Sequence, residues 1–95
     1  MNIEELKEAV PITEVLAHYG WEDDLVTNGW GEWRKILCPF HWDHTPSASL
    51  NEDRGLFRCF VCGDDRAMDI LDIVQHEEMF ETVKEAKAWI ERTFL

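Results

Sequence analysis

Hydrophobic residues near the N-terminus recur at helical spacing and are interrupted by helix boundary signals. Asn2 with Glu5 has the form of a capping box, and Pro11 suits the first turn of a second helix that ends at Gly20. One face of this second helix is apolar and consists of Ile12, Val15, Leu16 and Tyr19. The pattern therefore predicts two short helices within residues 2–20.

The central segment, residues 30–66, has the pattern of a small antiparallel sheet. Loose alternation of apolar and polar residues predicts strands over 32–37, 47–51 and 56–60, with a turn over 51–55. Helical spacing returns in residues 67–95, where Met68, Leu71 and Val74 share a stripe and Thr82 with Glu85 repeats the capping-box pattern. These elements predict the α+β class, with a small antiparallel β-sheet flanked by short helices.

Length and composition indicate one folded domain spanning residues 1–95. A chain of 95 residues has material for a single core, and 45% hydrophobic residues are too many for intrinsic disorder. No apolar run approaches the length of a membrane span, and the first ten residues lack the features of a secretory signal. We therefore expect a cytoplasmic protein with no membrane partner.

The net charge of −11 is unevenly distributed along the chain. Residues 30–66 hold five basic and six acidic side chains, so this segment carries −1 and the rest of the chain carries −10. Such an acidic chain is not expected to coat nucleic acid through bulk positive charge. The centre of the chain is therefore nearly neutral and lies between acidic flanks.

The cysteines form two spaced pairs, Cys38-Pro-Phe-His41 and Cys59-Phe-Val-Cys62, separated by seventeen residues. Each spacing lets a tight turn present two ligands, and two such turns complete a tetrahedral Cys3His site for one structural Zn²⁺ with no open position for a substrate. The alternatives are buried structural cysteines or a redox pair at Cys59 and Cys62. Two correctly spaced pairs are less accidental than one, which favours zinc.

These motifs resemble a known family. The runs 38–41, 45–47 and 57–63 are similar to the CHC2 zinc ribbon, the zinc-binding domain of bacterial and phage DNA primases. The resemblance implies that the zinc ligands are Cys38, His41, Cys59 and Cys62. It also implies a domain that binds single-stranded template DNA, helps select where a primer begins, and acts with a separate RNA-polymerising domain. His44 stands where the family has a lysine, and residues 64–69 are longer and more acidic than the family's Gly-Gly-Asp loop.

Candidate DNA contacts also lie in the central segment. Proteins hold single strands with basic side chains along the backbone and with aromatic rings on which the bases stack. The candidate residues are Arg34, Lys35, Trp42, His44, Arg54, Phe57, Arg58 and Arg66. The alternative is that aromatic residues such as Trp33 and Phe57 belong to the core and the arginines are only solvated. Strand alternation sets Arg34 opposite Trp33 and leaves open which of the two faces is outside.

The predicted function is template recognition in primer synthesis, with single-stranded DNA and a catalytic primase domain or subunit as partners and the replicative helicase as a further candidate partner. No catalytic centre is evident in this chain, so the DNA-directed RNA polymerase activity would come from another domain or subunit. Asp65, Asp69 and Asp72 could share a helix face that holds magnesium, but carboxylates at a helix start are more simply interpreted as caps. The alternative function is a zinc-stabilised acidic adapter or inhibitor that binds a replication protein without contacting DNA.

Overall fold

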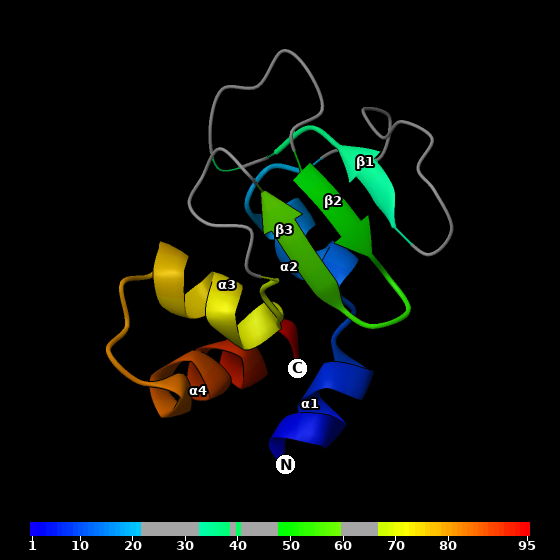
Figure 1. Ribbon diagram of the computed structural model, residues 1–95. Helices are drawn as coiled ribbons and strands as arrows, with labels where there is room; N and C mark the ends of the chain where they lie inside the picture. The colour runs from blue at the N-terminus through cyan, green and yellow to red at the C-terminus, as the bar shows by residue number, and fades with distance from the viewer. Residues whose placement is uncertain (22–32, 39, 41–47, 60–66) are drawn as a thin grey trace.

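The computed structural model describes residues 1–21, 33–38, 40, 48–59 and 67–95. Within these ranges the chain forms four helices and one three-stranded sheet (Figure 1). The elements follow in the order α1 (Ile3–Ala9), α2 (Ile12–His18), β1 (Arg34–Ile36), β2 (Ala48–Asn51), β3 (Leu56–Cys59), α3 (Ile70–Glu77) and α4 (Val83–Phe94). The predicted α+β class, with short helices flanking a small antiparallel sheet, is confirmed.

The two N-terminal helices begin and end close to the predicted residues. Asn2 and Glu5 form the reciprocal capping box at the start of α1. Pro11 is the N-cap residue of α2 rather than part of its first turn, so α2 starts one residue later than predicted. Gly20 follows α2 with φ +103°, a left-handed conformation that glycine adopts at little cost.

The sheet has the order β1-β2-β3 with both pairs antiparallel, so the two outer strands run in the same direction. The turn between β2 and β3 is closed by buried Asn51, whose side-chain oxygen accepts a hydrogen bond from the backbone N–H of Arg54 (N to O distance 3.0 Å). Gly55 in this turn has φ +66°. The observed β1 is shorter than the predicted 32–37.

One face of the sheet forms the core together with the helices. The buried strand residues alternate along β2 and β3, and α2 lies behind the sheet in the view of Figure 1. The buried apolar side chains come from every element and include Leu6, Val15, Leu16, Ile36, Leu50, Phe57, Ile73, Val74, Ala86 and Ile90. A backbone bridge between Phe57 and Met68, with N to O distances of 2.8 and 2.7 Å, attaches the start of the C-terminal helices to β3.

The carboxylates at the start of α3 cap the helix, as predicted. Asp69 is the N-cap residue and exchanges backbone-to-side-chain hydrogen bonds with Asp72, while Asp65 lies outside the described residues. At the start of α4, Thr82 accepts the backbone N–H of Glu85, but the Glu85 carboxylate accepts the N–H of Glu81 instead of that of Thr82. The predicted second capping box is therefore only half formed.

Helix α4 packs one face against the core. Ala86 and Ile90 are fully buried, and Trp89 and Phe94 pack partly buried against the core. The side chain of Val83 is 40% exposed, because it belongs to the first turn of the helix, at the edge of the packed face. No helix in the described part of the chain is long and apolar enough to cross a membrane.

Candidate metal centre and the outer face of the sheet

The sheet brings Cys38 and Cys59 to the same end of the fold. Cys59 is the last residue of β3 and pairs with Ala48, which pairs in turn with Ile36 on the far side of β2. Cys38 follows Ile36 by two residues, and β1 and β3 run in the same direction. The parallel outer strands therefore place both thiols at the same end of the sheet, and each cysteine is about 95% buried, with exposures of 4% and 5%.

The surroundings of Cys38 suit a metal-bound thiolate. The backbone N–H of Phe40 donates to the Cys38 sulfur, with an N to S distance of 3.5 Å. A hydrogen bond to sulfur favours the charged thiolate form, which is the form that binds metal. Two buried sulfurs at one end of the sheet, one of them accepting an N–H, fit Zn²⁺ as a borderline-soft ion.

The other predicted ligands, His41 and Cys62, lie outside the described residues. Each follows a described cysteine by three positions along the chain. In the described residues no group of three His, Cys, Asp or Glu side chains gathers in a way that could hold an ion. The structure thus places one member of each predicted pair.

The outer face of the sheet carries two of the predicted DNA contacts. Lys35, Ser49 and Arg58 form one cross-strand row, so their side chains project to the same side. Trp33 directly precedes β1 and, by alternation, lies on the side of Lys35. The guanidinium carbon of Arg58 lies 4.9 Å from the centre of the Trp33 ring, a cation–π contact. This outer face, defined by Trp33, Lys35, Ser49 and Arg58, combines two cations with an indole.

Two predicted contacts lie on the opposite side. Arg34, Leu50 and Phe57 form the neighbouring cross-strand row, which faces the core. Phe57 is 1% exposed and packs edge-to-face against Phe40, so its ring is inaccessible to a base and we remove it from the proposed DNA contacts. Arg34 belongs to this row and not to the row of Arg58, and its guanidinium forms an ion pair with Glu52.

The structure places only one of the four remaining predicted DNA contacts. Arg54 is exposed in the turn between β2 and β3. Trp42, His44 and Arg66 lie outside the described residues. The sequence left open whether Trp33 is a stacking ring or a core residue, although its position two residues before Lys35 places it in phase with that residue.

Helix α3 is fixed at both ends by long-range polar contacts. The Lys7 ammonium lies 2.8 Å from an Asp69 carboxylate oxygen at its start. Burial alone would raise the pKa of Asp69, but the Lys7 ion pair and the hydrogen bonds with Asp72 outweigh it and hold that pKa below its ordinary value. Beyond the end of α3, the Tyr19 hydroxyl donates to a Glu78 carboxylate oxygen at 2.9 Å.

Comparison with known proteins supplies a family context for this site. The family model described as CHC2 zinc finger matches residues 1–93. The Gene 58 protein of Mycobacterium phage D29 is 41% identical over 70 residues, which are 74% of this chain and 52% of that protein. The DNA primase of Halalkalibacterium halodurans is 39% identical over 62 residues, which are 65% of this chain and 10% of the primase.

A solved structure has the same fold. The crystal structure of the Aquifex aeolicus primase, with its zinc-binding and RNA polymerase domains, superposes with a TM-score of 0.67 and 28% sequence identity, covering 99% of this chain and 22% of that one. This chain therefore spans about half the length of the phage relative and about a tenth of the bacterial primase it matches.

Proposed function

Because the chain belongs to the CHC2 zinc finger family, the zinc-binding domain of DNA primases, we propose that it binds single-stranded template DNA and helps select primer initiation sites together with a separate polymerising domain. The observation that carries this proposal is the outer face. There Lys35 and Arg58 lie on either side of Ser49 in one cross-strand row, and Arg58 contacts Trp33. Basic side chains that follow a backbone and a ring on which a base can stack are the two parts of a single-strand site.

In this proposal one Zn²⁺ is held by Cys38, His41, Cys59 and Cys62, and the chain forms one domain over residues 1–95. When bound, the ion supplies a structural cross-link between the ends of β1 and β3, and it adds to the small core that 95 residues can bury. The paired strands would set the distance between the two ligand turns. The same strands carry Lys35 and Arg58 on the outer face.

Charge limits how strongly the isolated chain binds DNA. Three ligand thiolates and one Zn²⁺ would change the net charge from −11 to −12. Residues 1–21 hold four acidic residues and one lysine, and residues 67–95 hold seven acidic and three basic residues, so the two helical parts carry −3 and −4. A weak site of this kind works when a polymerising domain or subunit, or the replicative helicase, holds it beside the template, because tethering raises the effective concentration.

The excess of acidic residues on the helical parts favours a second candidate function, an adapter or inhibitor that binds a replication protein and does not contact DNA. Fluorescence anisotropy of a labelled single strand, measured over a salt series with the zinc-loaded chain, separates the two functions. Template binding predicts an affinity that falls steeply as salt rises. An adapter predicts no anisotropy change even at low salt, and that result would contradict the template-binding proposal.

A further inference from the structure

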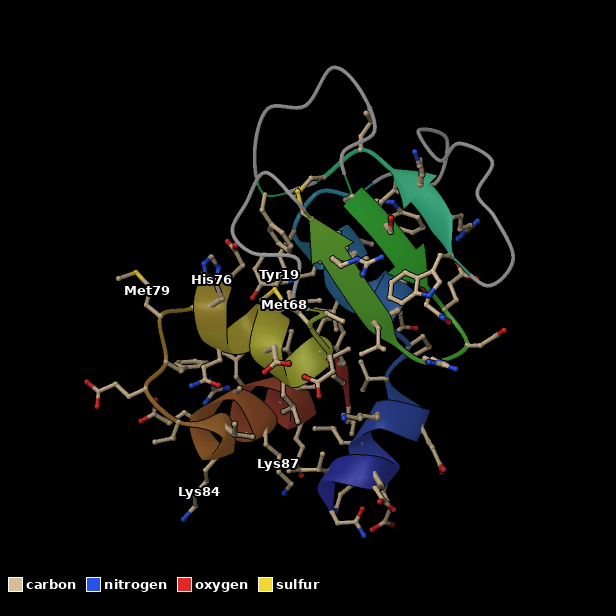
Figure 2. All side chains as sticks on the ribbon, viewed as in Figure 1. Tyr19, Met68, His76, Met79, Lys84 and Lys87 are labelled. Atoms are coloured by element: carbon tan, nitrogen blue, oxygen red, sulfur yellow. The ribbon has the colours of Figure 1, made fainter. Side chains whose placement is uncertain are left out.

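The side chain of Tyr19 connects the helices to the metal-binding end of the sheet (Figure 2). Its ring lies nearly parallel to that of Trp89, with centroids 6.3 Å apart and an angle of 10° between the planes. The same ring meets Phe40 at 60°, with centroids 5.7 Å apart. The Tyr19 hydroxyl donates to Glu78 at 2.9 Å. Contacts to a helix, a turn and the segment after α3 therefore fix this ring in one orientation.

Phe40 in turn touches the segments that carry both described cysteines. Its backbone N–H donates to the Cys38 sulfur at 3.5 Å. Its ring packs at 86° against Phe57, two residues before Cys59, with centroids 5.5 Å apart. A shift of Phe40 would therefore move its N–H away from the Cys38 sulfur and loosen the packing of its ring against Phe57 on β3.

We propose that Tyr19 is a positioning residue for the metal centre, because it holds Phe40 in the place where the Phe40 N–H reaches Cys38. The inference rests on the proposed zinc ligands and extends them to a side chain nineteen positions earlier in the chain. Groups that orient metal ligands without touching the metal commonly change metal affinity by about 10- to 100-fold. Burial and the Glu78 carboxylate raise the pKa of Tyr19, whose hydroxyl is protonated at neutral pH even at its ordinary pKa of about 10.

Zinc release into an excess of a chelating dye, followed by stopped-flow absorbance on the zinc-loaded chain, tests the proposal. Tyr19→Leu removes the ring and should release zinc about tenfold faster or more. Tyr19→Phe keeps the ring contacts and should stay within about threefold of the wild-type rate. Phe40→Leu provides a second variant on the same path and should also accelerate release. Release from Tyr19→Leu and Phe40→Leu within twofold of wild type would overturn the inference.

A matched control separates positioning from general stability. Val74 lies on α3 and is fully buried, so Val74→Ala should destabilise the fold by removing core packing. Val74→Ala should lower the melting temperature and leave zinc release near the wild-type rate. If Val74→Ala released zinc as fast as Tyr19→Leu at an equal loss of melting temperature, the effect of Tyr19 would be only structural and the proposal would be wrong.

Cobalt substitution gives a readout that does not depend on unfolding. The thiolate-to-cobalt absorption band should shift in Tyr19→Leu, because the Cys38 sulfur loses its N–H donor, and should be unchanged in Val74→Ala. A wild-type chain that binds neither zinc nor cobalt would contradict the proposed ligand set and this inference together. A wild-type chain that binds metal while Tyr19→Leu keeps the same spectrum and release rate would contradict the role of Tyr19 alone.

Discussion

The guanidinium carbon of Arg58 lies 4.9 Å from the centre of the Trp33 ring, although the two residues belong to opposite edges of the sheet. Arg58 is on β3 and Trp33 directly precedes β1, so the contact reaches across the outer face past β2. A cation–π contact at a partly exposed site contributes about 0.5–1 kcal/mol. The pair therefore holds a cation and an aromatic ring together on the surface proposed to meet single-stranded DNA.

Removing either cation of the outer face should weaken DNA binding. We expect Arg58→Ala and Lys35→Ala each to lower the affinity for a labelled single strand and to reduce the slope of log K against log salt by about 0.7, the value for one lost phosphate contact. Fluorescence anisotropy over a salt series measures both quantities. Arg92→Ala on α4 is the control, since this arginine lies in the last turn of a helix away from the sheet. An equal loss in Arg92→Ala would contradict the proposed surface.

Substitutions of Trp33 and Phe57 should have different effects, because Trp33 is proposed to contact DNA and Phe57 is a core residue. Trp33→Leu should weaken single-strand binding by about 1–3 kcal/mol, or roughly 5- to 150-fold, because a stacking ring is lost. Phe57→Leu should leave the affinity unchanged and lower the melting temperature, since Phe57 is 1% exposed and packs against Phe40. The reverse result, a loss of binding in Phe57→Leu alone, would restore Phe57 as a contact and exclude Trp33.

The sequence predicted the elements well because their signals are local. Capping residues, the turn at 51–55 and the apolar stripes place every helix and strand within a few residues of its observed position. The faces of the sheet were not assigned, although the signal was present. Residues two positions from a cysteine, such as Ile36 and Phe57, share its core-facing phase. Lys35 and Arg58, which are direct neighbours of these two residues in the chain, face outward. Contacts such as Tyr19 with Glu78 join residues 59 positions apart and depend on packing that no local pattern specifies.

Replacing Met79, in the turn between α3 and α4, with glycine should increase the stability of the fold. Met79 has φ +59° and its side chain is 85% exposed, pointing away from the molecule in Figure 2. It occupies the position after the α3 C-cap, and the N–H of Phe80 bonds to the Gln75 carbonyl as in a Schellman motif. Met79→Gly should stabilise the fold by about 1 kcal/mol in urea unfolding, because the left-handed strain disappears. Met79→Ala keeps the strain and should change little, and equal effects in both variants would contradict this explanation.

The ion pair between Lys7 and Asp69 should stabilise the fold by the same amount across neutral pH. The pKa of Asp69 is lowered in the folded chain, so its contribution is complete above the ordinary carboxyl pKa of about 4 and is lost as pH falls through the lowered value. Asp69→Asn keeps a helix cap and loses the ion pair, and should cost about 0.5–1 kcal/mol because the Lys7 side chain is 43% exposed.

Urea unfolding at pH 6, 7 and 8 should give the same difference between wild type and Asp69→Asn at each pH. A carbon NMR titration of the Asp69 carboxyl should place its pKa below the ordinary value. A stability difference that changes between pH 6 and 8, or a raised carboxyl pKa, would show that the ion pair does not control this site.

The metal content of the purified chain tests the proposed zinc centre most directly. Elemental analysis combined with native mass spectrometry should find one zinc per chain, and chelation should abolish the cooperative thermal transition, because the proposed ion would link the ends of β1 and β3. Cys38→Ser should reproduce the effect of chelation. A chain that contains no stoichiometric metal, or one that keeps its full cooperative transition after chelation, would contradict the zinc centre and the functions proposed from it.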